Sequence, residues 1–324
     1  MTRKKLLVFD AMNMFIRNYI VDPSLAIQGH PIGGTKGFMK SMQKVIRQVK
    51  PDEIVICWDG DGGSRRKRQA NKNYKAGRKP ARLNRSTRNL TEQQELENKI
   101  WQQLRIVEYL NQMPVVQLML SDIEADDIIA YVVQDAYYDD WNKIIVSMDK
   151  DFLQLMNDST ILLRPIKDQL VTKKTVIEEY GIHPRNFALA RAMAGDKSDN
   201  LEGVKGVGLG IVKKRFPFME EDRDVFINEI VEHCQSQKKK LVAHERIINS
   251  MDKIINNYKI MQLYSPNISS NAAQTIRHQC QQAQKFYNKS NILAMMMQDG
   301  IVDYNWTELW TCFRNICWGG KCAD

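Results

Sequence analysis

The sequence predicts an α/β protein in which a mostly parallel sheet is covered by helices on both faces and is followed by a smaller helical unit. Two observations predict this fold. Short apolar runs alternate with helical patterns from residue 4 to about residue 195, and strands that alternate with helices form parallel sheets buried on both faces. An acidic residue also stands at or just after the end of each expected strand, where open α/β sheets collect their functional groups.

The expected strands are short runs rich in Val, Ile and Leu, bounded by polar or turn residues. They cover Leu6 to Phe9, Ile54 to Cys57, Val115 to Leu120 and Ile144 to Met148. Because all four are apolar throughout, we expect them to be buried on both faces of the sheet.

Two helices connect these strands. Phe38, Met42 and Val45 recur at helical spacing after the Gly33-Gly34 turn, which predicts a helix between the first two strands. Another helix is expected from about Ile123 to Tyr137, with Ser121 or Asp122 as its cap. With these elements, residues 1–174 form the sheet domain.

Residues 175–260 are expected to form the helical unit. They contain several short helical patterns, broken by Gly181, Pro184 and a glycine-rich stretch from Gly203 to Gly208. Glycines at that spacing are typical of a helix-hairpin-helix turn, whose backbone N–H groups approach a phosphate at the start of a helix near Leu209. Residues 261–324 are expected to be a helical segment of unknown role.

Composition limits the class of protein. The chain has 324 residues with 26% charged and 43% hydrophobic residues, which suits a globular protein with one large or two ordinary domains. It contains no apolar run of about 18 residues, so no membrane role is expected. Six scattered cysteines are too few for a disulfide framework, and we therefore expect a reducing cytoplasm, that of the host if the protein is viral.

Positive charge is concentrated in one internal segment. No acidic residue occurs between Asp61 and Glu92, and this segment contains eleven Lys and Arg residues. Since these eleven positive charges exceed the net charge of +9 of the whole chain, the rest of the chain is slightly acidic. Such a run is either a solvated, disordered segment or a phosphate-facing loop. Its position between two expected elements favours a basic arch over about residues 62–91.

Carboxylates are the strongest chemical signal. Acids follow each expected strand, and two more precede the glycine-rich stretch: Asp10, Asp59, Glu124, Asp126, Asp127, Asp149, Asp151, Asp196 and Asp199. Any single aspartate here could be a local cap. Parallel strands, however, would bring these acids to one edge, where they repel one another unless cations lie among them. All-oxygen ligands suit Mg²⁺ or Mn²⁺, and two such ions about 4 Å apart support phosphodiester hydrolysis.

These motifs together resemble the flap endonuclease and 5′-3′ exonuclease family. Its members include the stand-alone bacteriophage enzymes, among them the phage ribonuclease H, and the 5′-nuclease domains of bacterial DNA polymerases. The matching stretches run from Val8 to Asn13, Cys57 to Gly60, Ile123 to Asp127, Ser147 to Asp151 and Gly195 to Gly208. The resemblance covers about residues 4–235. It implies a PIN-like nuclease domain with a helix-hairpin-helix (helix-three-turn-helix) DNA-binding subdomain.

The resemblance also implies roles for single residues. One Mg²⁺ is expected around Asp10, Asp59, Glu124, Asp126 and Asp149, with Asp127 at the edge, and a second around Asp149, Asp151, Asp196 and Asp199; Mn²⁺ is an expected substitute. Lys75 and Arg78 are the expected catalytic residues, since the run from Asn73 to Arg78 matches the segment that reaches the scissile phosphate. The expected DNA contacts are Arg65, Arg68, Lys72, Tyr74, Gly203, Lys205, Gly206, Gly208, Lys213 and Lys214, with a monovalent cation at the helix-hairpin-helix turn.

The expected function is metal-dependent hydrolysis of phosphodiesters near 5′ ends of DNA, and of RNA paired to DNA, during replication. Flaps, nicks and 5′ overhangs are the expected substrates, a monomer the expected state, and a single-strand-binding or other replication protein the expected partner. Two alternatives remain open: a PIN-type ribonuclease, and a non-catalytic flap-binding protein that keeps the fold without the chemistry.

Overall fold

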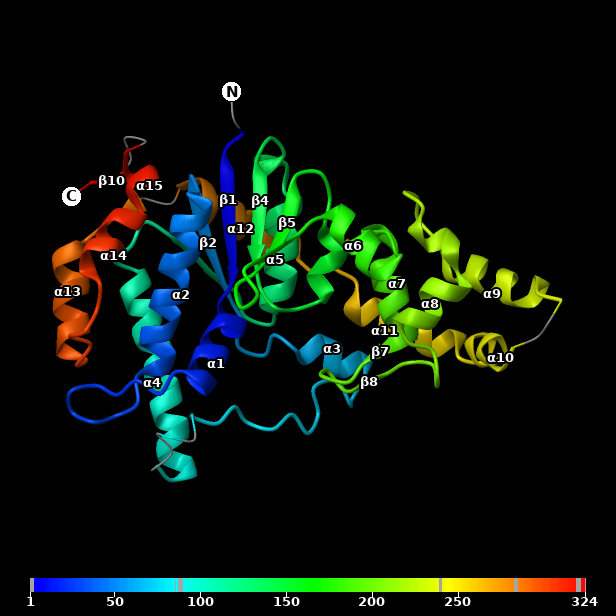
Figure 1. The fold of residues 1–324 in the computed structure, drawn as a ribbon, viewed down its shortest axis with the longest axis horizontal. Helices are drawn as coiled ribbons and strands as arrows, with labels where there is room; N and C mark the ends of the chain where they lie inside the picture. The colour runs from blue at the N-terminus through cyan, green and yellow to red at the C-terminus, as the bar shows by residue number, and fades with distance from the viewer. Residues whose placement is uncertain are drawn as a thin grey trace.

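A computed structural model describes residues 3–84, 86, 90–238, 241–282, 285–318 and 322–323. Its centre is a six-stranded sheet in the order β3-β2-β1-β4-β5-β6 (Figure 1). The strands are β1 (Lys5–Asp10), β2 (Glu53–Trp58), β3 (Val116–Met119), β4 (Asn142–Val146), β5 (Thr160–Arg164) and β6 (Gln169–Val171). All neighbours are parallel except β5 and β6, which confirms the predicted α/β fold.

The four predicted strands are confirmed within two residues at each end. β5 and β6 were not predicted. Thr160–Arg164 offers only three consecutive aliphatic residues before Arg164 and Pro165, and the three residues of β6 form the antiparallel edge of the sheet. Runs this short carry little periodicity.

Helices cover both faces of the sheet because alternate residues of each strand point to opposite faces. Leu6 and Val8 join an apolar cluster with α5 (Ala125–Gln134). Leu7 and Phe9 join another with α1 (Ala11–Val21), α2 (Gly33–Val49) and α4 (Glu92–Leu110). Both faces are therefore dry, as the continuous apolar strands predict.

The predicted cap of α5 is wrong. Glu124 is the N-cap residue, while Asp122 lies in the preceding loop with a positive φ of 62°. Its backbone N–H donates to the carbonyl of Asp61. This pairing with the loop after β2 keeps residues 121–123 out of the helix and sets Glu124 at its start.

The helical unit packs directly on the α5 face of the sheet. Its elements are α6 (Lys173–Tyr180), α7 (Pro184–Ala194), β7 (Gly195–Asp196), β8 (Leu201–Glu202), α8 (Leu209–Arg215), α9 (Ile227–Ser236), α10 (Val242–Ile248) and α11 (Met251–Met261), with a 3₁₀ turn at Pro217–Glu220. Two further 3₁₀ turns, at Ala136–Tyr138 and Asp151–Leu155, lie on either side of β4 in the sheet domain. Phe187 of α7 and Val212 of α8 share one apolar cluster with the sheet. The domain boundaries at 174 and 260 stay predictions.

The carboxyl-terminal residues add further helices to the two layers that cover the sheet. They form α12 (Ser270–Gln282), β9 (Lys285–Phe286), α13 (Lys289–Gln298), α14 (Trp306–Cys312), α15 (Arg314–Trp318) and β10 (Cys322–Ala323). Ile292 of α13 and Leu309 of α14 are fully buried in the cluster that contains α2 and α4. Among the described residues, no helix is long and apolar enough to cross a membrane.

Candidate active site

The acids predicted from the strand ends do gather at one edge of the sheet. β1 ends at Asp10, β2 is followed by Asp59, and α5 starts beside the end of β3. A cleft of about 1250 Å³ opens at this edge. It is lined by Asp10, Asp59, Asp126, Asp149 and Asp199 together with Lys75 and Arg78. The parallel sheet thus brings the predicted acids and the predicted catalytic cations into one cavity.

Four of the acids, Asp10, Asp59, Asp126 and Asp149, form what we call the unpaired acids. Within the part of the chain that the structure describes, no Lys, Arg or His forms an ion pair with any of them. Three of them, Asp10, Asp59 and Asp149, accept hydrogen bonds from backbone N–H or hydroxyl groups. Asp10 accepts one from the N–H of Asn13 at 3.1 Å and one from the Ser147 hydroxyl at 2.8 Å.

The other unpaired acids are held in a similar way. Asp59 accepts a hydrogen bond of 2.9 Å from the N–H of Ala125, which ties the end of β2 to the first turn of α5. Asp149 accepts one of 2.8 Å from the N–H of Asp151. These bonds fix the position of each carboxylate and leave its charge without a cation.

The unpaired acids repel one another. Burial raises the pKa of Asp10 to about 7, and the charges of Asp59 and Asp149 add to the rise. Burial likewise raises the pKa of Asp126, with further contributions from Asp149 and Asp10. Because each of these two groups feels its neighbours' charge and all four acids line the same cleft, negative charge is concentrated there.

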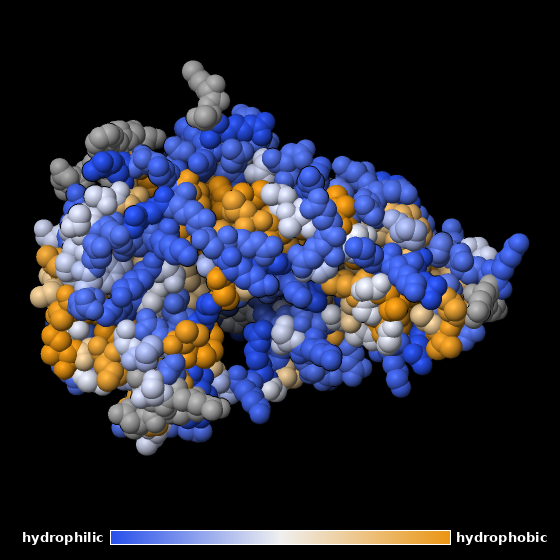
Figure 2. Space-filling view, viewed as in Figure 1, coloured by the Kyte–Doolittle hydropathy of each residue, from blue (hydrophilic) through white to orange (hydrophobic). Residues whose placement is uncertain are grey.

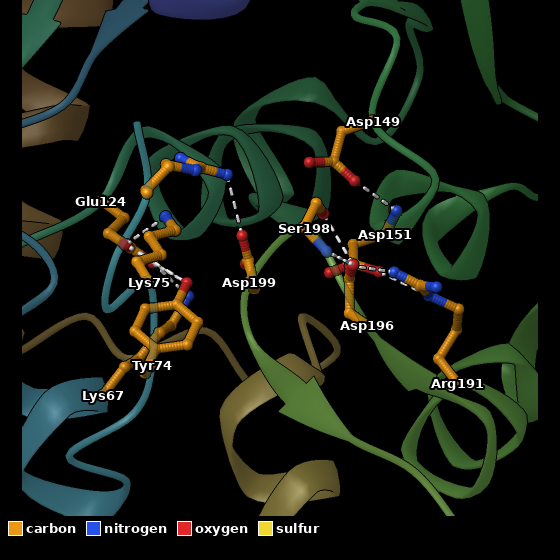
Figure 3. A network of polar contacts seen from close by, with 11 residues as sticks. Lys67, Tyr74, Lys75, Glu124, Asp149, Asp151, Arg191, Asp196, Ser198 and Asp199 are labelled. Carbon is orange, nitrogen blue, oxygen red and sulfur yellow. Dashed lines mark hydrogen bonds and ion pairs between the residues drawn. The ribbon is translucent and has the colours of Figure 1, made fainter. Parts of the chain in front are cut away.

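Glu124 is in the opposite state (Figure 3). Its carboxylate lies 2.5 Å from the ammonium of Lys67 and 2.7 Å from that of Lys75, and it accepts a hydrogen bond of 3.1 Å from the hydroxyl of Tyr74. Although burial opposes ionisation, the two lysines lower the pKa of Glu124 to about 2. This acid is fully compensated by the chain itself.

Lys67 is a site residue that sequence reasoning missed. It lies on α3 (Arg65–Ala70), and its ammonium also approaches Asp127 at 3.5 Å and lies 5.9 Å from the ring centre of Tyr74. In sequence it is one of four consecutive basic residues. No feature of the sequence distinguishes it from Arg66 and Arg68 on either side. In the structure it is less exposed than either of them.

The acids predicted for a second metal are also paired. Arg191 bridges them, donating to Asp151 at 3.0 Å and to Asp196. Asp199 forms an ion pair of 2.9 Å with Arg78. Figure 3 shows these pairs side by side around the loop after α7. Together with Glu124 and Asp127 they form the paired acids: Glu124, Asp127, Asp151, Asp196 and Asp199.

Asp151 is intermediate between the two groups. Burial and the charge of Asp149 raise its pKa to about 7, despite the opposing charge of Arg191. Arg191 was not singled out in the sequence. Its signal is a cation within the apolar run from Phe187 to Ala194 of α7, four residues before Gly195, but nothing in the pattern alone shows which acids it meets.

The predicted DNA contacts at the base of the arch divide into two sets. Arg65, Arg68 and Lys72 line one shallow surface pocket, and Arg65 forms an ion pair of 3.0 Å with Asp122. Tyr74 is not on the surface. Only 3% exposed, it packs against Leu201, Ile260 and Met261, so in this conformation its ring cannot meet a nucleic acid and instead anchors the arch to the body.

The predicted helix-hairpin-helix residues lie in the helical unit, in the turn between β8 and α8 and on α8 itself. Gly206 has a φ of +79°, and a Cβ on Gly203 would come within 2.2 Å of the backbone of Ala194, so both positions require glycine. Gly208 is the N-cap residue of α8. Lys205, Lys213 and Lys214 are exposed around this turn.

The donor set fits a hard divalent cation. The unpaired acids offer only carboxylate oxygens without a compensating ion pair, which is the chemistry that Mg²⁺ and Mn²⁺ prefer, and Asp10 among them is buried. In the described part of the chain no three acid, His or Cys side chains are already arranged as a metal site. The paired acids are held instead by Lys67, Lys75, Arg78 and Arg191. An ion is therefore expected first at Asp10, Asp59, Asp126 and Asp149.

Comparison with known families gives one match. Residues 5–181 match the model described as the 5′-3′ exonuclease, N-terminal resolvase-like domain. The 5′-3′ exonuclease of Aquifex aeolicus is 27% identical over 217 residues, covering 65% of this chain and 70% of that protein. DNA polymerase I of Thermus thermophilus is 30% identical over 205 residues, covering 63% of this chain but only 23% of the polymerase.

Solved structures share the whole fold. A bacteriophage T5 protein co-crystallised with metal ions has a TM-score of 0.63 and 15% identity, covering 91% of this chain and 98% of that one. The T5 flap endonuclease in a pseudo-enzyme-product complex with DNA and metal ions has a TM-score of 0.66 and 16% identity, covering 91% and 100%. The catalytic core of Rad2 with a DNA substrate has a TM-score of 0.51 and 11% identity, covering 97% and 92%. These likenesses confirm the predicted PIN-like fold.

Proposed function

The chain belongs to the 5′-3′ exonuclease family, and on that premise we propose that it is a divalent-metal-dependent nuclease that hydrolyses phosphodiester bonds near the 5′ ends of DNA. Membership makes it a nuclease; the metal, the substrate structure and the residue roles are the proposal. The observation that carries it is the cleft in which Asp10, Asp59, Asp126 and Asp149 converge without cations while Lys75 and Arg78 line the same cavity.

Metal binding is assigned first to the unpaired acids. Mg²⁺ bound there would lower the pKa of an attacking water and steady the leaving oxygen. The chain prepares the position: Asn13, Ser147 and Ala125 orient the carboxylates of Asp10 and Asp59. A second ion would need Asp149 together with Asp151, Asp196 and Asp199, three of which are engaged by Arg191 and Arg78.

Lys75 and Arg78 act on the phosphate. Both line the cleft, and each is held by an acid of the body, Glu124 and Asp199 respectively. A phosphate entering the cleft would compete with these acids for the two cations. We assign to them the stabilisation of negative charge on the phosphoryl oxygens in the transition state.

Substrate binding is assigned to surfaces flanking the cleft. Arg65, Arg68 and Lys72 would meet a single-stranded 5′ end, and the turn from Gly203 to Gly208 would hold duplex phosphates without reading sequence. We propose 5′ flaps, nicks and overhangs of DNA as substrates, and RNA paired to DNA as a further one. The same proposal includes action as a monomer in a reducing cytoplasm, recruitment by a replication protein and a monovalent cation at the helix-hairpin-helix turn.

The deciding experiment is cleavage of a 5′-labelled flap with and without Mg²⁺. The wild type should cut near the flap junction only with the ion, and Asp149→Asn should lose about a thousandfold or more of the rate while still binding the flap. Asp140→Asn, at an exposed position elsewhere, is the matched control. A wild type that binds flaps and never cuts them would show a non-catalytic protein, and cleavage confined to unpaired RNA would show a ribonuclease.

A further inference from the structure

A second concentration of positive charge lies on α2, outside the arch. From residue 23 to residue 51 the chain has no Asp or Glu. Within this stretch Lys36, Lys40, Lys44 and Arg47 recur every three or four residues along α2. That spacing places them on one face of the helix, and the outward side of α2 contributes to the hydrophilic band on the front of the molecule (Figure 2).

This face forms one wall of a groove. The groove has a volume of about 900 Å³ and lies between the second half of α2 and the carboxyl-terminal helices α14 and α15. Its charged lining consists of five cations, Lys40, Lys44, Arg47, Lys50 and Arg314, and one acid, Glu308. A cavity with this balance is built to receive negative charge.

Glu308, the one acid that lines the groove, already has partners on α2. Glu308 accepts a hydrogen bond of 2.9 Å from the side-chain amide of Gln43 and forms an ion pair of 2.5 Å with Arg47. Both contacts hold α14 against α2, and Tyr304 reinforces them by donating to Gln43 at 2.9 Å. Glu308 therefore shapes the groove, and it forms no ion pair with Lys40, Lys44 or Lys50.

The remaining lysines are available. Among the described residues, neither Lys40 nor Lys50 has an acidic partner within 4 Å, and both are exposed. Lys44 meets only Asp168, at 3.7 Å, with more than half of each side chain exposed. Such an exposed pair contributes little, so an incoming carboxylate can displace it.

The groove is at the far end of the sheet from the cleft. α2 ends at Val49, just before β2, and the ammonium of Lys5 at the start of β1 donates to the Val49 carbonyl. Asp59 follows the other end of β2. Six residues of strand separate the two ends by about 20 Å, and Figure 1 shows α14 and α15 beside the amino ends of the strands. The groove is not an extension of the cleft.

We infer that this groove binds an acidic segment of a partner protein, an interaction that goes beyond the proposed nuclease activity. Its uncompensated lysines and its amides Gln48, Asn305 and Asn315 suit a row of carboxylates. A single nucleic-acid strand is the less suitable occupant, because the one aromatic residue of the lining, Tyr304, is only 8% exposed and offers no surface for base stacking.

The test is binding of a short fluorescein-labelled peptide rich in Asp and Glu, followed by anisotropy at low salt. Lys40→Glu with Lys50→Glu should weaken its binding about tenfold. A matched control, Lys174→Glu with Lys253→Glu, makes the same change of charge at exposed positions on α6 and α11 and should leave binding within about twofold. Cleavage of an unassisted flap should be the same in both variants and the wild type.

Three results would overturn the inference. The wild type could fail to bind the peptide; the two double variants could lose affinity equally, which would show attraction by net charge or by the arch; or the groove variant could lose affinity for a single-stranded oligonucleotide as strongly as for the peptide, which would make the groove a nucleic-acid track. Thermal unfolding of each variant shows that it is folded, and Lys40→Gln with Lys50→Gln gives a milder change if the reversal is not tolerated.

Discussion

The unpaired acid Asp10 and the paired acid Glu124 lie at the same edge of one sheet, yet their pKa values are shifted in opposite directions. Asp10 has a pKa raised to about 7 by burial and by its acidic neighbours, while Glu124 is ionised with a pKa lowered to about 2. Both are buried. What separates them is the presence of Lys67 and Lys75 beside Glu124.

This difference shows where an external cation is needed. Each paired acid has a Lys or Arg supplied by the chain, from α3, the arch or α7. Among the unpaired acids, Asp10, Asp59 and Asp149 are held by N–H and hydroxyl donors, which carry no full positive charge. Like charges gathered without a partner are costly, so a divalent ion offers most where the chain itself offers no charge.

Among the cations that pair with these acids, the largest effect is expected at Lys75, which pairs with Glu124 and lines the cleft. Lys75→Ala should raise the barrier to flap cleavage by about 3 kcal/mol, roughly a hundredfold in rate, because its contact with the phosphate forms mainly in the transition state. Single-turnover rates and flap affinities, measured separately, test this.

Lys79→Ala removes a charge from the same segment and serves as the control for Lys75, with a small effect on binding and little on rate. Equal losses of rate and affinity in Lys75→Ala would reduce Lys75 to an anchor of the arch and remove it from the chemistry.

A substitution of Lys67 tests whether the paired acids depend on their cations for stability. Lys67→Met leaves Glu124 with one cation and Asp127 with none, and an acid left buried after its partner is removed is destabilising. We expect the free energy of unfolding to fall by about 2 kcal/mol, measured by urea denaturation without metal. Arg66→Met, an exposed neighbour on the same helix, should change it by less than about 0.5 kcal/mol; a similar loss in both variants would mean that Lys67 is not a resident counter-ion.

The pH dependence of the folding stability tests whether the pKa of the unpaired acid Asp10 is raised. A carboxyl whose pKa is higher in the folded than in the unfolded protein binds more protons when folded, so its contribution to stability is complete below the unfolded pKa and is lost as the pH rises through the folded value. For Asp10, whose pKa is raised from 3.8 to about 7, this loss falls between about pH 4 and pH 7.

Metal-free protein should therefore become less stable toward neutral pH by about 1–2 kcal/mol relative to Asp10→Asn. Mg²⁺ should restore stability most above pH 7, where the acids are deprotonated. Thermal unfolding in a chelator and in Mg²⁺ across this range measures both effects. A wild type whose metal-free stability rises in parallel with that of Asp10→Asn would show that Asp10 carries no raised pKa.

The positions of the acids could be predicted from the sequence better than their pairing with cations. Parallel strands bring their carboxyl ends to one edge whatever the details of packing, so Asp10, Asp59 and Asp149 could be placed from the strand pattern alone. The cations that compensate the other acids could not, because Lys67 lies 57 residues before Glu124 and Arg191 lies 40 residues after Asp151. Such pairs depend on how α3 and α7 pack.

The same reason explains the other gaps. Tyr74 was expected to contact DNA, yet it is buried against Ile260 and Met261, which no local pattern indicates. The groove beside α2 requires Glu308, 261 residues along the chain from Arg47. Periodicity predicts which face of an element is apolar, but it does not predict which distant element covers the polar face.

The central claim is that the unpaired acids are the primary divalent-metal site. Anomalous diffraction from crystals of the protein soaked in Mn²⁺ tests it directly. The account predicts a manganese peak bonded to carboxylate oxygens of Asp10, Asp126 and Asp149, at distances of about 2.1–2.3 Å, with Glu124 still beside Lys67. A peak that displaces Lys67 and binds Glu124 while leaving Asp10 and Asp126 without an ion would contradict it.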